Sequence, residues 1–151
     1  MSHWTSLNAD DLKAAGLGNV VDKAASTAVG ATDPVAEEIA NAVARVRRAV
    51  SGGGNQLDAD AARVPRSLKA VTVRIAFYAL CARLRWPLSD DQKSLRDDDT
   101  KDLSAIGNPA KKTFVETPDT PAGMGEMQTP STFFTVQDGN SGNAREDLRG
   151  L

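Results

Sequence analysis

The stretch "PRSLKAVTVRIAFYALCARLRW", residues 65 to 86, is the longest apolar segment of the chain and decides the fold class. Its apolar side chains recur at helical spacing and form two stripes. One stripe comprises Leu68, Val71, Ile75, Tyr78 and Ala82, and the other comprises Val73, Phe77, Leu80 and Leu84. Two apolar faces predict a central helix, packed between the preceding helix and another element. We expect it to end at Trp86, because the residue before a proline is pushed out of helical geometry.

The segment before this helix carries the clearest helix start in the chain. Asp33 is a typical N-cap residue, and Pro34 suits the first helical position. A single apolar stripe follows, made by Val35, Ile39, Val43, Val46 and Val50. The glycine-rich stretch at 51–55 predicts the end of this helix.

Two further helical regions flank these segments. Asn8 begins a short helix that Gly16 can end, and a second brief helical segment follows at 19–26. After the central helix, Ser89 can cap an acidic helix that closes at Gly107. The sequence therefore predicts a mainly α fold, a small bundle of about four helices.

The carboxyl-terminal third has a different composition, rich in Thr, Pro and Gly. We divide the chain into a helical domain, 1–107, and an extended arm, 108–151, in which "TFVE" and "STFFTV" are short β-prone stretches. Fixing the backbone costs about 1–2 kcal/mol per residue, more than the few apolar groups of the arm can offset locally. We therefore expect the arm to be ordered by other molecules, through the apolar residues Phe114, Val115, Phe133, Phe134 and Val136.

The residues that most enzymes use are scarce. His3 is the only histidine, and Cys81 is the only cysteine and lies in an apolar run. The stretch "SGGGNQ" lacks the lysine of a phosphate-binding loop. The aspartates at 98, 99 and 102 can hold a divalent cation only weakly, and a solvated acidic face is the preferred interpretation. We expect no enzymatic activity, no cofactor and no metal, and neither a signal peptide nor a membrane span.

The charges are separated along the chain. Residues 34–88 hold nine basic and four acidic side chains, a net charge of +5, whereas residues 89–106 hold six acidic and three basic ones, a net charge of −3. This separation suits subunits that pair side by side, with the set Arg45, Arg47 and Arg48 facing the set Asp97, Asp98 and Asp99; a solvated charged surface explains it equally well. A third interpretation is phosphate contact, as in a small helical DNA-binding or regulatory protein with a disordered tail, by the arginine cluster Arg45, Arg47, Arg48, Arg83 and Arg85.

The order of these features resembles the head-tail connector (adaptor) proteins of tailed bacteriophages, including those of Mu-like phages. The resemblance covers residues 7–107 and lies in the short "NADDLK" helix, the capped alanine-rich helix, the central helix ending "YALCARLRWPLS" and the acidic helix. The long arm and the glycine-rich loop at 51–55 depart from that family's pattern.

The resemblance implies a structural virion protein with no catalytic residues. It implies a homo-oligomeric ring, usually twelve-fold, that is assembled in the host cytoplasm and docks below the portal protein in the virion neck. Such a ring extends the channel for double-stranded DNA and offers a platform to a tail-terminator or neck protein. Acidic side chains suit a channel wall that DNA slides past, and we expect Asp98, Asp99 and Asp102 to line it.

Overall fold

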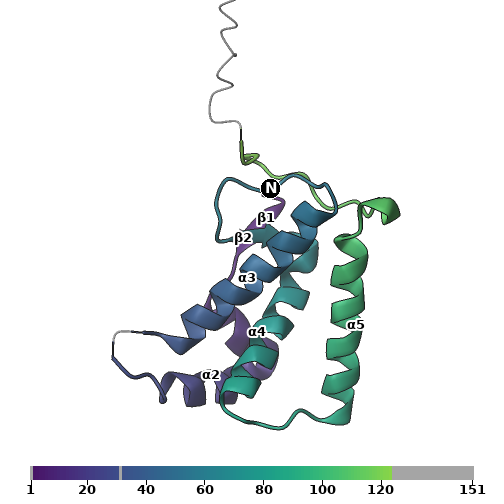
Figure 1. Cartoon of the computed structure of the whole chain (residues 1–151). Helices are drawn as coiled ribbons and strands as arrows, with labels where there is room; N and C mark the ends of the chain where they lie inside the picture. The colour runs from purple at the N-terminus through teal and green to yellow at the C-terminus, as the bar shows by residue number, and fades with distance from the viewer. Residues whose placement is uncertain (1, 31, 124–151) are drawn as a thin grey trace, which may run out of the picture.

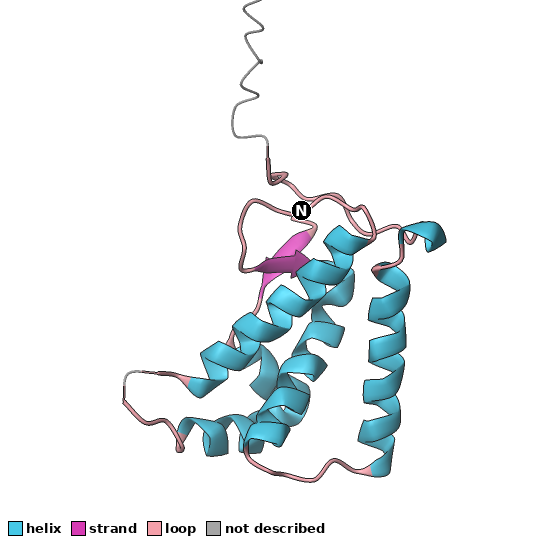
Figure 2. Ribbon diagram, in the orientation of Figure 1, coloured by secondary structure: helices cyan, strands magenta, loops and turns pink. Residues whose placement is uncertain are grey.

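The computed structural model describes residues 2–30 and 32–123, and this part of the chain is mainly helical, as predicted. Helices α3 (Pro34–Gly52) and α4 (Lys69–Arg83) pack along each other, and α5 (Asp90–Ile106) stands beside them (Figure 1). The amino-terminal helices α1 (Ala9–Leu12) and α2 (Gly18–Ala25) are joined by the π-helical turn η1 (Lys13–Leu17). Figure 2 shows these helices forming the body of the molecule.

Helix α3 forms as the sequence predicts. The Asp33 carboxylate accepts hydrogen bonds from the backbone N–H groups of Val35 and Ala36, at 2.9 and 3.3 Å. These bonds satisfy two of the backbone donors that a helix start leaves free. The predicted apolar stripe is buried along its whole length, in the residues Val35, Ile39, Val43, Val46 and Val50.

Helix α4 is shorter than the apolar segment that encodes it. It begins at Lys69, after the 3₁₀ turn η2 (Arg66–Leu68), and ends at Arg83 instead of Trp86. The expected start at Pro65 is wrong because that residue belongs to a strand. At the other end, Arg85 adopts a left-handed conformation with φ of 53°, which turns the chain before Trp86 is reached.

The two strands found among the described residues lie outside the arm. β1 (Trp4–Ser6) pairs antiparallel with β2 (Arg63–Pro65), with Trp4 opposite Pro65 (Figure 2). The β-prone stretch at 113–116 forms no strand within the single chain. The other expected stretch, at 131–136, lies outside the described residues. Trp4 is 2% exposed and anchors the strand pair in the core.

The first part of the arm packs on its own subunit. We call residues 113–123 the strap. The indole Nε1 of Trp4 donates to the carbonyl of Glu116 at 2.9 Å, and the strap's Thr120 and Ala122 exchange backbone hydrogen bonds with the loop at 57–59. The division of the chain at residue 107 therefore needs correction, because the body extends through the strap.

The carboxyl ends of α3 and α5 approach each other very closely. A Cβ atom added at Gly53 would lie 2.0 Å from the backbone carbonyl oxygen of Ile106, a distance that real Cβ atoms essentially never show. The glycines that sequence analysis assigned to a helix end thus also permit this contact, which positions α5 against the bundle.

Candidate interaction surfaces

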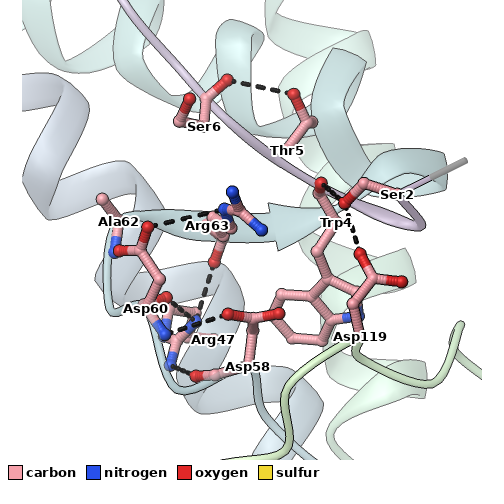
Figure 3. Close-up of polar contacts among 10 residues, drawn as sticks. All are labelled: Ser2, Trp4, Thr5, Ser6, Arg47, Asp58, Asp60, Ala62, Arg63 and Asp119. Carbon is pink, nitrogen blue, oxygen red and sulfur yellow. Dashed lines mark hydrogen bonds and ion pairs between the residues drawn. The ribbon is translucent and has the colours of Figure 1, made fainter.

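Arg47 fixes the loop between α3 and β2. Its guanidinium donates to the backbone carbonyls of Asp58, Asp60 and Arg63, at 2.7, 2.9 and 2.8 Å (Figure 3). It also lies 5.6 Å from the centre of the Trp4 ring, within range of a cation–π interaction. The expectation that Arg47 pairs with a neighbouring subunit is therefore wrong, because its donors are already engaged within the chain.

Asp99 is likewise an intramolecular residue. Its carboxylate is 3% exposed and accepts two hydrogen bonds from Arg74, at 2.5 and 2.8 Å, and one from the hydroxyl of Tyr78, at 3.3 Å. The hydrogen bond to Asp99 raises the pKa of the Arg74 guanidinium. Burial, followed by the charge of Asp99, raises the pKa of Tyr78 above its ordinary value. The expectation that Asp99 lines a channel or pairs between subunits is wrong.

The other predicted acidic residues are exposed on α5. Asp97 lies 3.4 Å from Arg96, Asp98 lies 3.1 Å from Lys101, and Asp102 is exposed further along the helix. Contacts between exposed charges of this kind contribute little to stability. These three carboxylates therefore remain accessible to another molecule.

The arginine cluster is divided by the fold. Arg45 and Arg48 are exposed and make no ion pair within the part of the chain that the structure describes. Arg83, by contrast, donates to Glu37 and Glu38 of α3, at 2.9 and 3.2 Å. The basic surface is consequently smaller than the sequence suggests.

The two apolar residues predicted in the first part of the arm point in opposite directions. Val115 is 6% exposed and belongs to the core of its own subunit, so its predicted role as an intermolecular anchor is wrong. Phe114, next to it, is 83% exposed. Because its buried neighbour and the strap's hydrogen bonds fix the backbone, the ring of Phe114 is held toward solvent. The remaining predicted anchors, Phe133, Phe134 and Val136, lie outside the described residues.

An apolar groove of about 680 Å³ runs along the side of α4. Its floor is Val73 and Phe77, one wall includes Leu17 of η1, and the opposite wall includes Leu95 of α5. We call it the α4 groove. The second apolar stripe of α4 is visible in the sequence, but the groove is not. The groove depends on how far α5 lies from α4, and this distance is set by the packing of the whole chain.

A second groove, of about 540 Å³, lies between α3 and the amino-terminal segment. Ile39 and Val43 form its base, and Leu7 and small side chains of α3 and the loop at 61–62 surround it. We call it the α3 groove. No basic side chain lines it.

The strap carries two acidic groups whose pKa values are lowered, Glu116 and Asp119. Burial opposes ionisation of Glu116, but hydrogen bonds from the hydroxyl and backbone N–H of Ser67 outweigh it and lower its pKa. The pKa of Asp119 is lowered by the hydrogen bond that Ser2 donates to it (Figure 3). These two carboxylates thus hold the strap to the body in their charged form.

The described ranges 2–30 and 32–123 show no cluster of three or more His, Cys, Asp or Glu side chains placed to hold a metal ion. In the same ranges, no helix combines the length and the apolar character that crossing a membrane requires. Comparison of the chain with protein-family models, with curated proteins and with solved structures found no match.

Proposed function

We propose that this protein is the subunit of a head-tail connector (adaptor) ring of a tailed bacteriophage. In this proposal, copies of the chain assemble below the portal protein in the virion neck, extend the channel for double-stranded DNA and carry the tail-terminator or neck protein. The role is structural, with no catalytic step and no cofactor.

The observation that supports the proposal best is the outward position of Phe114. Phe114 is 83% exposed on a well-anchored segment, so its ring is available for another molecule to cover. The molecule also has two separate apolar grooves. A protruding aromatic residue and a depression at different places on one surface allow head-to-tail contacts, and such contacts generate rings when the rotation closes.

The exposed carboxylates of α5 suit the proposed channel. Asp97, Asp98 and Asp102 are free to face passing DNA, and acidic side chains keep phosphates from binding tightly. The alternative of a DNA-binding regulator needs a continuous basic surface. Arg47 and Arg83 are engaged inside the chain, which removes two of the five arginines that this alternative needs.

A complementation experiment tests the proposal. A phage whose gene for this chain is interrupted should produce DNA-filled heads without tails, and the full-length chain should restore tailed particles. We expect Phe114→Ser to restore few of them, while the matched exposed substitution Val29→Ser restores them fully. Normal tailed particles from the interrupted phage would contradict the proposed function.

A further inference from the structure

The α4 groove, of about 680 Å³, has a larger volume than the α3 groove, of about 540 Å³. Val73 and Phe77 form its floor, and the wall residue Leu95 is 44% exposed. A smaller depression continues the groove as far as Trp86, which is 46% exposed, and shares Leu17 and Phe77 with it. The half-exposed side chains of Leu95 and Trp86 therefore border one continuous apolar surface, formed by the groove and this depression.

The groove is basic at one end. Arg66, Lys69 and Arg74 line it together with Asp11, and the carboxylate of Glu116 is bonded to the lining residue Ser67. Lys69 is paired with Asp11 at 2.6 Å, and Arg74 with Asp99. Arg66 is exposed and has no ion-pair partner among the described residues. An occupant should combine apolar side chains with negative charge.

One segment of the chain itself has this composition. Residues 126–138, "EMQTPSTFFTVQD", contain two acidic residues and no basic residue, for a charge of −2. Its apolar side chains gather in "STFFTV", residues 131–136. Six extended residues span about 20 Å. Along α4 the groove runs from Lys69 to Phe77, eight residues or about 12 Å of helical rise, and Arg66 of η2 and the depression at Trp86 extend it at its two ends.

The path of the strap indicates which copy supplies the segment. Glu116 lies beside the groove, where it is bonded to Ser67, but the strap then runs to Ala122, which donates to the carbonyl of Leu57. The Leu57 loop is held on the opposite side by Arg47 of α3, whereas the groove opens between η1 and α5. The last described residues of the strap therefore lie at the Leu57 loop and not in the chain's own groove.

We propose that the α4 groove of one subunit binds residues 126–138 of a neighbouring copy, with Phe133 and Phe134 on its apolar floor and the acidic residues toward its basic end. This inference rests on the proposed function and deepens it, because it names the surface that receives the arm. Each subunit would then both offer a segment and receive one, which is the arrangement of a heterologous, ring-forming contact.

A labelled peptide of residues 126–138 tests the contact against the full chain. We expect saturable binding by fluorescence anisotropy, with a shift in the emission of Trp86. Leu95→Glu should weaken binding by about 10-fold or more, since it places a charge on the apolar wall. The matched control Val29→Glu, at a residue that is 89% exposed and outside the groove, should bind like the wild type. Equal affinity of the Leu95→Glu and wild-type chains, with both folded by circular dichroism, would overturn the proposal.

Mixing two full-length variants distinguishes a neighbour's segment from the chain's own. A Leu95→Glu chain keeps its arm, and a Phe133→Ser, Phe134→Ser chain keeps its groove, so each should stay monomeric alone. Mixed one to one, they should form a heterodimer and nothing larger in analytical ultracentrifugation. If the mixture stays monomeric at concentrations where the wild type associates, the segment of one copy does not bind the groove of another, and the proposal is refuted.

The two proposals fail in distinguishable ways. Rings that form on a portal with the Leu95→Glu chain as well as with the wild type would overturn the groove contact and leave the connector function standing. A wild-type chain that binds the peptide and forms the heterodimer, but never associates with a portal, would support the groove contact and contradict the proposed function.

Discussion

Replacing Arg47 by alanine should destabilise the protein strongly. The variant loses three hydrogen bonds, of 2.7 to 2.9 Å, to backbone carbonyls of one loop, and the cation–π contact with Trp4. A hydrogen bond from a charged donor contributes roughly 1.5–3 kcal/mol, and a cation–π contact about 0.5–1 kcal/mol. Because the three bonds act on one loop, their losses overlap, and we expect a total of about 2–4 kcal/mol.

Urea denaturation followed by circular dichroism measures this effect. With a denaturant slope near 2 kcal/mol per molar urea, the midpoint for Arg47→Ala should fall by roughly 1–2 M. The midpoint for Arg47→Lys should lie between those of Arg47→Ala and the wild type, because a lysine ammonium cannot bond three separate carbonyls as the planar guanidinium does.

The adjacent Arg48 provides the matched control, because it is exposed and makes no ion pair in the described part of the chain. Arg48→Ala should change the free energy of unfolding by less than about 0.5 kcal/mol. If Arg47→Ala and Arg48→Ala denature at the same midpoint, the role assigned to Arg47 is refuted.

Three further predictions concern the packing and the titrating groups. Gly53→Ala should lower the free energy of unfolding by roughly 1–3 kcal/mol, because the added methyl group overlaps a backbone carbonyl of α5. The absorbance titration of Tyr78, the only tyrosine, should give a pKa above its ordinary value of 10.0, and Asp99→Asn should lower that pKa. Ser67→Ala should cost about 0.5–1 kcal/mol at neutral pH, and that difference should shrink as the pH falls below 4.5, the ordinary pKa of Glu116.

The direction in which stability changes with pH follows from the protonation state that the fold favours at each group. The pKa of Tyr78 is raised in the folded protein, so its contribution to stability is complete below pH 10 and is lost as the pH rises through the folded-state value. The pKa of Glu116 is lowered, so its contribution is present above pH 4.5 and is lost as the pH falls through the folded-state value.

Each of these predictions has a contradicting result. Gly53→Ala with the stability of the wild type would mean that the ends of α3 and α5 are further apart. A Tyr78 pKa at or below 10.0 would contradict its burial beside Asp99. A difference between Ser67→Ala and the wild type that is the same at pH 7 and pH 3 would contradict the hydrogen bond to an ionised Glu116.

The helices could be predicted from sequence because their signals are local. The Asp33–Pro34 start, the valine stripe of α3 and the Ser89 cap of α5 each depend on residues within a few positions of one another, and the structure confirms all three. The strands were missed for the opposite reason. Three-residue strands at 4–6 and 63–65 carry almost no local signal, and they form because the indole of Trp4 is buried against distant segments.

Several predicted site residues were wrong because charge patterns do not show which side chains are already paired. Arg47 and Asp99 looked like their exposed neighbours Arg48 and Asp98, yet each is held by long-range contacts inside the chain. Val115 likewise looked like Phe114 in a β-prone stretch. Only the packing of the strap shows that one of the two is buried.

The central claim is that this chain assembles on a portal and that its exposed apolar side chains are covered there. Native mass spectrometry of the chain, mixed with portal rings of the phage proposed to encode it, tests this claim most directly. We expect a complex in which each portal ring carries a closed ring of this chain. With the Phe114→Ser variant, much less of that complex should form. A chain that stays monomeric beside unoccupied portal rings, at every concentration tried, would contradict it.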